Sequence, residues 1–382
     1  MSLAEGGRTG RDDPGGVASA TTFTGEGMPR HYGDPGGEYG AAANEAAVFD
    51  RCERVPLRVS GRAPSDMLKG VLSGRTPAPP ERTPGGLVLF DAPYSAALTP
   101  KGRLVSDLRL WRDDVDGAET LLLDVPAEGA QALREHLARV MPPRFATVGD
   151  AGDLGMITVV GPAAAERLGA TLDLAGPAGD PPAPDALADR LAELPEGRGV
   201  WVEWVRVIRT EDVSPGGYDV VGPRTHLAGL WERLLEAGVR PAGRGVWHTL
   251  RVEAGRPAFG FDMGADTLPY EAGIVERAVD HTKGCYTGQE VIVRIRDRGH
   301  VNRHLRGLRL GDGPTPRAGT TLHHGGREVG RVTSTAESPR YGPLALAYVR
   351  REVEPGSTVA VGEAEGPAAQ VADLAEDWPG SV

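Results

Sequence analysis

One local pattern occurs twice in this chain, and the two copies start about one hundred residues apart. Each copy is an apolar, strand-like run that ends in glycine and is followed within a few residues by a proline. The runs are Val55–Gly61 and Met156–Gly161, and the prolines are Pro64 and Pro162. Because proline is favoured in the first turn of a helix, each copy predicts a strand, a turn and a helix. The recurrence predicts two similar α+β units.

The chain changes character beyond about residue 302, where short strand-like runs and turns replace the helical patterns. His323–Arg327 has the composition of a hairpin tip and Leu344–Val349 that of a strand, which predicts a small all-β domain. The start of the chain is rich in Gly, Asp, Pro and Arg without an apolar period, so we expect it to be disordered. The expected segments are a tail at 1–38, α+β units at 39–150 and 151–301, a β domain at 302–372 and a frayed acidic end at 373–382.

Composition argues against several classes of protein. The chain has 42 basic and 53 acidic side chains, a formal charge of −11, whereas nucleic acids are bound by basic surfaces. Two cysteines cannot build a disulfide framework, and no apolar run approaches the roughly 18 residues of a membrane span. The first residues lack the basic and apolar regions of a signal peptide. We therefore expect a cytoplasmic protein of two or three domains, not bound to membranes, with nucleic acid an unlikely partner.

The segment with the most unusual chemistry is Lys283–Glu290, which reads Lys-Gly-Cys-Tyr-Thr-Gly-Gln-Glu and leads into a predicted strand at Val291–Arg296. Its two glycines permit a sharp backbone path and close approach of a ligand. A lysine two residues from the Cys285 thiol favours the reactive thiolate. Gln289 and Glu290 add an amide and a carboxylate. The segment could hold a polar heterocycle beside a nucleophile or soft ligand, and a tight turn with an inert buried cysteine is the alternative.

A second candidate segment is a predicted hairpin, whose strands Ser95–Leu98 and Leu104–Trp111 flank the turn Thr99–Gly102. Lys101 in this turn is one of only three lysines among the 42 basic residues, so it is either placed for chemistry or present by chance. Asp107 faces the opposite side of its strand from the neighbouring leucines. It is a lone carboxylate, so the sequence does not support acid–base catalysis by a pair.

Signatures of several other chemistries are missing from the sequence. His281 and Cys285 are four residues apart, but no further Cys or His pair completes a zinc set, so no metal site is predicted. There is no dinucleotide-binding glycine motif, P-loop or nucleophile elbow. Six arginines lie between Arg294 and Arg309, with only Asp297 opposing them. They fit either an anionic ligand such as RNA or a solvated strand face with ordinary surface pairs.

Lys283–Glu290 is similar to the signature octapeptide of the YgfZ family of folate-binding proteins, which are relatives of the glycine-cleavage aminomethyltransferase, GcvT. Other segments match in the same order. Thr99–Arg103 with Asp107 resembles the first hairpin of the family, and further matching segments are Gly217–Val220, Leu250–Gly255, Gly299–Arg303 and Thr333–Ser334. The resemblance runs from about residue 40 to about residue 370.

The resemblance implies an α+β fold in which two ferredoxin-like units and a C-terminal antiparallel β-barrel surround a central folate cavity. It also implies tetrahydrofolate as the cofactor, iron–sulfur proteins as clients for assembly or repair, and a functional thiol at Cys285. By the same resemblance, the residues expected at the folate are Lys101, Asp219, Arg251, Lys283, Gly284, Gly288, Gln289 and Glu290.

Three positions depart from the aminomethyltransferase pattern. This chain has Ser106–Asp107 where the transferase has paired aspartates, and Asp219 where it has a glutamate. It has Trp247–Arg251 where the transferase reads Arg-Asp-Ser-Leu-Arg. These changes weaken methylene-transfer chemistry and leave a folate pocket plausible, so we expect a YgfZ-type folate-binding protein. The alternative is an aminomethyltransferase that moves a one-carbon unit to tetrahydrofolate, with Asp107 polarising the substrate nitrogen.

Overall fold

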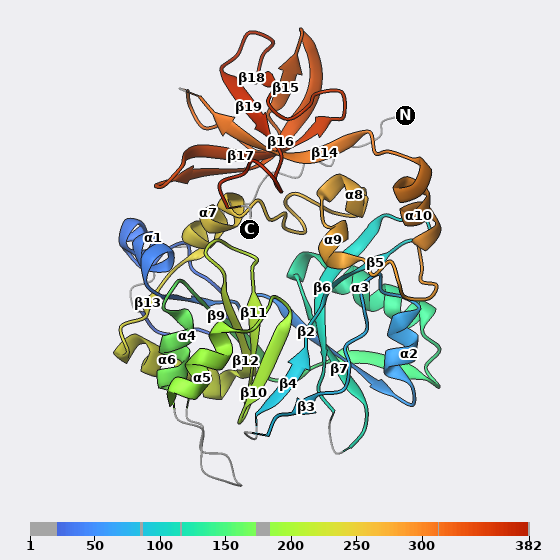
Figure 1. Ribbon diagram of the computed structural model, residues 1–382, viewed down its shortest axis with the longest axis vertical. Coiled ribbons are helices and arrows are strands. Elements are labelled where there is room, and N and C mark those ends of the chain that lie inside the picture. Colours follow the sequence, from blue (N-terminus) through green and yellow to red (C-terminus); the bar gives the residue numbers. More distant parts are fainter. Residues whose placement is uncertain (1–20, 85–86, 115–116, 173–183, 312, 381–382) are drawn as a thin grey trace, which may run out of the picture.

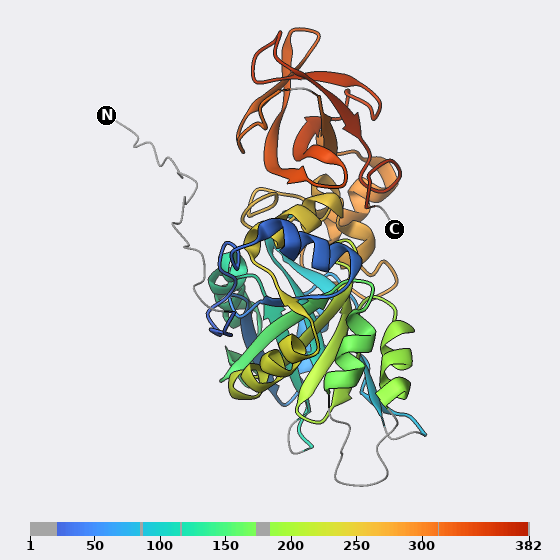
Figure 2. The same ribbon diagram turned by 90° about the vertical axis from the view of Figure 1, so that its left-hand side faces the viewer.

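The structure is a computed structural model, and it describes residues 21–84, 87–114, 117–172, 184–311 and 313–380. Figure 1 shows two α+β units side by side, with a β-barrel stacked above them. The turned view in Figure 2 shows the barrel at one end of the molecule, with helices between it and the two sheets. The predicted α+β fold with a terminal barrel is confirmed.

The first α+β unit is a five-stranded antiparallel sheet in the order β5-β6-β7-β2-β8. Its apolar face buries Leu57 and Leu121 in one core with Leu68 and Leu133, which come from two helices. The predicted hairpin around Thr99–Gly102 is β5 and β6. The elements of this unit are β2 (Val55–Gly61), α2 (Pro64–Lys69), β5 (Tyr94–Leu98), β6 (Leu104–Arg112), β7 (Thr120–Val125), α3 (Ala127–Val140) and β8 (Ala146–Asp150).

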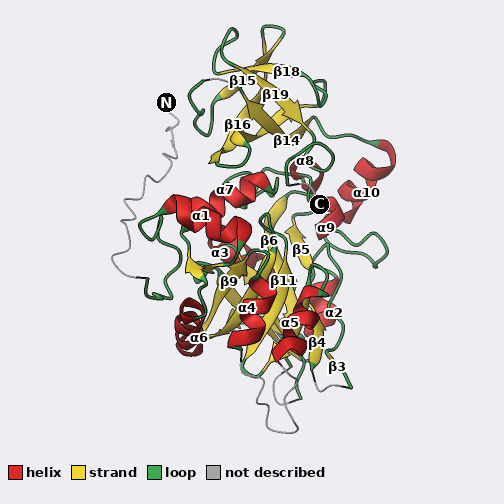
Figure 3. Ribbon diagram, turned by 60° about the vertical axis from the view of Figure 1, so that its left-hand side comes forward, coloured by secondary structure: helices red, strands yellow, loops and turns green. Residues whose placement is uncertain are grey.

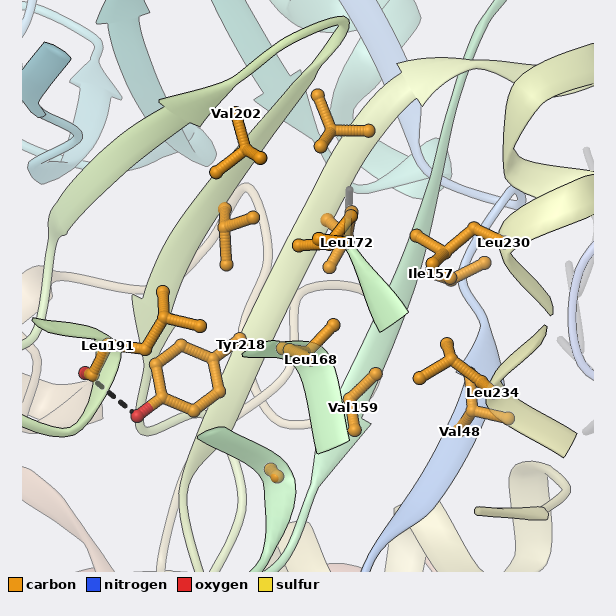
Figure 4. Close-up of a cluster of buried hydrophobic side chains, with 14 of the residues drawn as sticks. Val48, Ile157, Val159, Leu168, Leu172, Leu191, Val202, Tyr218, Leu230 and Leu234 are labelled. Carbon is orange, nitrogen blue, oxygen red and sulfur yellow. Dashed lines mark hydrogen bonds between the residues drawn. The ribbon is translucent and has the colours of Figure 1, made fainter. Parts of the chain in front are cut away.

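The second unit is an eight-stranded sheet in the order β13-β1-β9-β12-β11-β10-β4-β3, covered on one face by helices whose apolar side chains share its core (Figure 3). Figure 4 shows its core, where Tyr218 also donates a hydrogen bond of 2.9 Å to the Leu191 carbonyl. Its elements are β1 (Ala47–Asp50), β3 (Glu81–Arg82), β4 (Val88–Asp91), β9 (Leu154–Val160), α4 (Ala164–Thr171), α5 (Pro184–Ala192), β10 (Arg198–Val202), β11 (Val205–Thr210), β12 (Gly217–Pro223), α6 (Arg224–Glu236) and β13 (Arg240–Pro241).

The boundary predicted near residue 150 does not separate the two sheets. Strands β1, β3 and β4 come from the predicted first unit but pair within the eight-stranded sheet. Conversely, residues 259–292 come from the predicted second unit and pack on β5 and β6, where Ala272 and Ile292 share a core with Leu104. The units exchange segments because strand pairing joins strands that are distant in the sequence. The local periodicity of the sequence does not indicate such long-range pairing.

The barrel is closed, with the order β14-β17-β16-β15-β18-β19. Helix α7 (Arg244–Glu253) packs against β16 and β17 and so carries the barrel on the α+β body. The barrel strands are β14 (Arg303–Leu310), β15 (Thr321–His324), β16 (Arg327–Ser338), β17 (Gly342–Arg350), β18 (Thr358–Val361) and β19 (Ala368–Ala372). The remaining helices are α1 (Pro35–Asn44), α8 (Pro269–Ala272), α9 (Val275–Ala278) and α10 (Gln289–Arg298).

The two terminal segments predicted to be disordered or frayed are anchored where the structure describes them. In the predicted tail at 1–38, residues 1–20 lie outside the described part, but Thr21 accepts a hydrogen bond of 2.8 Å from the Trp231 indole and α1 begins at Pro35. The predicted frayed end at 373–382 includes Trp378, which is buried and donates a hydrogen bond of 2.8 Å to the Val252 carbonyl. In both places one tryptophan indole fixes the backbone by a hydrogen bond. The average composition of a segment does not reveal such a single contact.

The strand predicted at Val291–Arg296 is wrong, because these residues belong to helix α10. Gly288 precedes the helix with a positive φ of 85°, a conformation that favours glycine. Ile292 is buried, and Val291 and Ile295 on the same helical face are half-buried. The β-branched residues favour a strand locally, but packing of this face on the neighbouring hairpin outweighs that preference.

The six arginines between Arg294 and Arg309 are therefore divided between a helix and a barrel strand. Arg296 is ion-paired with Asp297 at 2.7 Å and Arg303 with Glu271 at 3.2 Å, while Arg306 is paired with Asp373. Ordinary pairs account for half of the set, so the structure does not support one continuous anion-binding stripe.

Candidate functional site

A cavity of about 650 Å³ lies where the two α+β units and helix α7 meet. One wall is an N-terminal strap, residues 22–32, which crosses from the Asp50 carboxylate to the start of α7. Gly25 N donates to Asp50 at 2.9 Å, and Arg244 N donates to the Pro29 carbonyl at 2.8 Å. The lining residues on the strap are Thr22, Thr24, Glu26, Gly27, Met28, Pro29 and Tyr32.

The other walls combine aromatic side chains with charges of both signs. Tyr94, Trp247, Phe259 and Phe261 supply the aromatic surface. The charged lining residues are Arg51, Glu53, Arg54, Asp107, Arg109, Asp124, Glu128, Asp212, Arg244, Arg251, Arg256 and Arg277, together with Glu26 on the strap. Such a lining can bind a flat ring by stacking and orient it through a few charged hydrogen bonds.

Asp107, predicted from its place on the hairpin, lines this cavity. Its Oδ2 accepts a hydrogen bond of 2.8 Å from the Tyr94 hydroxyl, while its Oδ1 is buried with no hydrogen-bond partner among the described residues. Burial raises the pKa of the Asp107 carboxyl, and the Arg54 guanidinium and the Tyr94 hydrogen bond oppose that rise. A buried carboxylate oxygen without a partner is costly unless something binds it, which marks Asp107 as the point of contact for a ligand.

Arg54 links Asp107 to a second carboxylate at the cavity wall. Its Nε donates to Asp124 Oδ1 at 2.5 Å, from the end of β7. Asp124 raises the pKa of Arg54 further above its ordinary value. Arg54 is therefore a fixed positive charge beside Asp107, and it offsets the repulsion between the Asp107 and Asp124 carboxylates.

A second charge cluster lies on the other side of Tyr94. Arg277 from α9 pairs with Asp212 at 2.9 Å and with Glu196, and its guanidinium carbon lies 4.7 Å from the centre of the Tyr94 ring. Arg109 approaches Glu196 at 3.4 Å. The two arginines hold the pKa of the Asp212 carboxyl well below its usual range. The cluster therefore keeps its charges in the folded protein.

Trp247 and Arg51 form a stacked pair on the wall next to the strap. The Arg51 guanidinium carbon lies 3.9 Å from the centre of the Trp247 ring, and Phe49 packs edge-on against the same ring at 5.2 Å between centres. Arg51 Nε also donates to Glu53 at 2.8 Å. Trp247 is one of the positions that depart from the aminomethyltransferase pattern, so this wall differs in chemistry from the one that the resemblance implies.

Arg251, the second predicted residue at the cavity, is tied into the junction with the barrel. Its Nη1 pairs with Asp262 Oδ2 at 2.6 Å, and its Nη2 donates to Ser334 at 2.8 Å. His248 lies beside it and bonds to the Thr335 carbonyl at 2.9 Å. Burial and the Arg251 charge lower the pKa of His248 to about 4, so the ring is neutral near pH 7. Arg251 faces the cavity, but its bonds stabilise the junction.

Asp219 is buried on β12 and is not among the described lining residues. Its Oδ1 accepts a hydrogen bond of 2.7 Å from the Thr158 hydroxyl on the neighbouring strand. Burial and the nearby Asp212 charge raise the pKa of Asp219 to about 6. The side chain is one methylene shorter than glutamate, and it is held within the sheet.

The octapeptide Lys283–Glu290 is also outside the cavity lining. Lys283 Nζ donates to the carbonyls of Leu72 and Gly74, both at 2.7 Å, so the ammonium fixes the loop to the chain after α2. Burial lowers the pKa of Lys283 to about 8. A Cβ on Gly288 would lie 2.7 Å from the Thr99 carbonyl oxygen, so this glycine permits close packing on the hairpin turn.

The remaining predicted residues lie on the outer face of the same region. Cys285, Gly284, Lys101 and Glu290 are exposed, and Gln289 is half-buried at the start of α10. The alternative interpretation, an inert buried cysteine, is therefore wrong about burial, because Cys285 is exposed. The octapeptide is a surface loop with an accessible thiol at Cys285. Apart from Cys285, nine residues are predicted at the site, and of these only Asp107 and Arg251 line the cavity.

Sequence reasoning missed the residues that surround Asp107. Tyr94 precedes the predicted strand by one position, and Tyr94 pairs with Arg109 across the hairpin. That register could have placed both side chains near Asp107. Arg54, Asp212 and Arg277 follow irregular segments and reach the cavity only through the fold, so no local pattern indicates them.

Among the residues that the structure describes, no group of three or more His, Cys, Asp or Glu side chains has an arrangement that could hold a metal ion. None of the helices described is long and apolar enough to cross a membrane.

Comparison with known proteins places the chain in a family. Residues 16–283 match the model of the GCVT N-terminal domain, and residues 303–373 match that of the glycine cleavage T-protein C-terminal barrel domain. The chain is 32% identical over 358 residues to an aminomethyltransferase of Ralstonia pickettii, covering 90% of this chain and 89% of that protein. It is 30% identical over 355 residues to one of Ralstonia nicotianae, covering 90% and 89%.

The fold also matches a solved structure. The crystal structure of the glycine cleavage system aminomethyltransferase T from Bartonella henselae superposes with a TM-score of 0.74 at 23% identity, covering 91% of each chain. This likeness concerns the fold, while the family models span most of the sequence. The chain belongs to the glycine cleavage T-protein (GCVT) family.

Proposed function

We propose that this protein binds tetrahydrofolate in the cavity around Asp107 and transfers a one-carbon unit to it, as an aminomethyltransferase does. This was the alternative interpretation of the sequence. Its main support is the position of Asp107, because this residue lines the cavity together with aromatic and charged side chains and its buried Oδ1 has no hydrogen-bond partner among the described residues. The names of the relatives at 30–32% identity support the same reaction class.

The residues present fit a folate. The cavity volume of about 650 Å³ falls within the roughly 300–1,000 Å³ of pockets that hold ligands of this size. Trp247, Phe259 and Phe261 offer surfaces for the pterin and aminobenzoyl rings. Arg244 lines the cavity, is exposed, and makes no ion pair with a described residue, so it is suited to a carboxylate of the glutamate tail.

Asp107 would act on the amine of the one-carbon donor. Bound tetrahydrofolate would supply the nucleophilic nitrogens that accept the one-carbon unit. The Asp107 carboxylate would hold the donor amine by a charge-assisted hydrogen bond to Oδ1, while Tyr94 occupies Oδ2. Arg54 would stabilise the ionised carboxylate between binding events. Because Asp107 is buried, this hydrogen bond would be stronger than it is in water.

The test is complementation of a bacterium that lacks its own aminomethyltransferase and must use glycine as a one-carbon source. The wild-type chain should restore growth, and Asp107→Asn, which keeps the size but removes the charge, should not. Cys285→Ser is the matched control and should restore growth like the wild type. Growth with Asp107→Asn equal to the wild type, or no growth with a soluble wild-type chain, would contradict the proposal.

A second candidate function is support of iron–sulfur proteins, as the similarity of the octapeptide to the YgfZ family implies. The observation in its favour is the exposure of Cys285 on a loop that Lys283 and Gly288 fix in place. An accessible thiol could contact a client protein while folate occupies the separate cavity. In that case Cys285→Ser, and not Asp107→Asn, should reduce the activity of iron–sulfur enzymes in cells that lack their own protein of this type.

A further inference from the structure

Tyr94 lines the cavity and is held both through its hydroxyl and through the face of its ring. Its hydroxyl donates to Asp107 Oδ2 at 2.8 Å, and the Arg277 guanidinium carbon lies 4.7 Å from its ring centre. Tyr94 is on β5 and Arg277 on α9, so the two come together only through the packing of α9 on β5. A cation over the face of a tyrosine ring fixes the ring and makes its hydroxyl a stronger hydrogen-bond donor.

Arg277 is itself fixed by two carboxylates. It pairs with Asp212 at 2.9 Å, and its Nε donates to Glu196 Oε2 at 3.3 Å. Glu196 precedes β10 and Asp212 follows β11, so both approach from the eight-stranded sheet. A guanidinium with two such partners and an aromatic face has little rotational freedom, which makes it a rigid support for the tyrosine.

We propose that Arg277 is a positioning residue that acts through Tyr94, so that the Asp107 carboxylate keeps Oδ2 bound and turns Oδ1 toward the ligand. Arg277 contacts Tyr94 and not the Asp107 carboxylate. Its effect on Asp107 is therefore transmitted by the Tyr94 hydroxyl and by the charge that Arg277 neutralises on Asp212. The inference deepens the proposed one-carbon transfer and rests on it for its role in catalysis. The arrangement of the three side chains can be tested separately.

The direction of the effect follows from the charges that face Asp107. These are Arg54 from the loop after β1, Tyr94 from β5 and Asp212 from the loop after β11; Arg54 and Tyr94 lower the pKa of Asp107, and Asp212 raises it. The Arg277 charge lowers the pKa of Tyr94 and so strengthens its donation. Removal of Arg277 weakens the tyrosine hydrogen bond and exposes the Asp212 charge. Both changes favour the protonated form of Asp107.

The experiment measures the titration of Asp107 without any ligand. The protein is labelled with carbon-13 at the aspartate carboxyls, and the Asp107 signal is assigned by its loss in Asp107→Asn. In Arg277→Met the midpoint should move to higher pH, and Arg277→Lys, which keeps a positive charge, should fall between this variant and the wild type. Tyr94→Phe removes the donor and should shift the midpoint in the same direction.

Arg303→Met is the matched control. Arg303 also lies over a tyrosine ring, 4.5 Å from the centre of Tyr348, and pairs with Glu271 at 3.2 Å, but it is at the barrel junction and does not line the cavity. Its loss should leave the Asp107 midpoint unchanged. An unchanged midpoint in a folded Arg277→Met protein, or an equal shift in Arg303→Met, would overturn the inference. If Arg277→Met does not fold, Arg277→Lys and Tyr94→Phe decide the question.

The catalytic part is tested by one-carbon transfer kinetics. With Arg277→Met, kcat should fall by about tenfold, because a misplaced Asp107 carboxylate holds the donor amine less well in the transition state, while KM for tetrahydrofolate stays within about twofold. The acid side of the pH–rate profile should shift in step with the Asp107 midpoint. A wild-type protein without transfer activity would contradict the proposed function alone, since the midpoint shift still tests the positioning. A rise in KM with unchanged kcat would contradict the positioning role.

Discussion

Arg251 Nη1 lies 2.6 Å from Asp262 Oδ2 in an ion pair that is buried at the junction between α7 and the barrel. Asp262 also accepts hydrogen bonds from the Ser334 hydroxyl at 2.7 Å and the Thr333 hydroxyl at 2.5 Å, both on β16. These bonds hold the pKa of the Asp262 carboxyl below its usual value. One buried pair thus joins the cavity wall to the barrel and fixes the position of α7.

Removal of Arg251 should be strongly destabilising, because it leaves the Asp262 charge buried without its cation. For Arg251→Met we expect the free energy of unfolding to fall by about 3–5 kcal/mol, measured by urea denaturation. Arg331→Met is the control, since Arg331 and Glu328 form an exposed pair at 3.1 Å and its loss should cost less than about 1 kcal/mol. Equal losses in the two variants would show that the buried pair has no special role.

Two glycines of the octapeptide should respond differently to alanine. Gly288 has a φ of +85° and its Cβ would lie 2.7 Å from the Thr99 carbonyl oxygen, whereas a Cβ on Gly284 meets nothing within 4 Å. Gly288→Ala should therefore lower the free energy of unfolding by about 1–3 kcal/mol, and Gly284→Ala by much less. Thermal unfolding of both variants checks this. If Gly284→Ala is the more damaging change, the loop does not pack on the hairpin as described.

The buried Asp219 should make stability depend on pH. Its pKa is raised from 3.8 to about 6, so between these values the folded protein binds more protons than the unfolded chain. Asp219 therefore destabilises the fold progressively as the pH rises through this window, and the penalty is complete above it. Asp219→Asn should be more stable than the wild type at pH 8, by on the order of 2 kcal/mol, with no gain near pH 4. A difference that is independent of pH would contradict this assignment.

Cys285 should be dispensable for the fold and for folate binding, because it is exposed and does not line the cavity. We expect Cys285→Ser to unfold at the same temperature as the wild type and to bind tetrahydrofolate with a Kd within about twofold of it, since surface substitutions have small effects. Calorimetry of both proteins provides the measurement. Loss of folate binding in a folded Cys285→Ser protein would place the loop at the ligand.

The sequence predicts the fold well where one element carries its own pattern. The hairpin around Thr99–Gly102, the recurring strand before each proline, and the barrel beyond residue 302 are all confirmed. The strand predicted at Val291–Arg296 is wrong because these residues have strand propensity locally but form helix α10, whose packing depends on the distant hairpin. Likewise, the exchange of β1 and β4 into the eight-stranded sheet depends on pairing between distant segments.

The site was only partly predictable for a related reason. Asp107 could be found because its side chain lies on the opposite side of its strand from the neighbouring leucines, and Arg251 because its segment resembles a family motif. The octapeptide was the most conspicuous segment, yet its lysine and Gly288 serve to fix a surface loop. Arg54 and Arg277 acquire their roles from charge partners on other segments, and sequence spacing carries no information about those contacts.

The most direct measurement is a calorimetric titration of the protein with tetrahydrofolate, carried out for the wild type, Trp247→Ala and Cys285→Ser. Trp247→Ala removes an aromatic wall of the cavity, and Cys285→Ser changes only the surface loop. We expect saturable binding at one site, weakened by at least about tenfold in Trp247→Ala through lost stacking and unchanged in Cys285→Ser. Absence of saturable binding to the folded wild-type protein, or equal weakening in the two variants, would contradict this expectation.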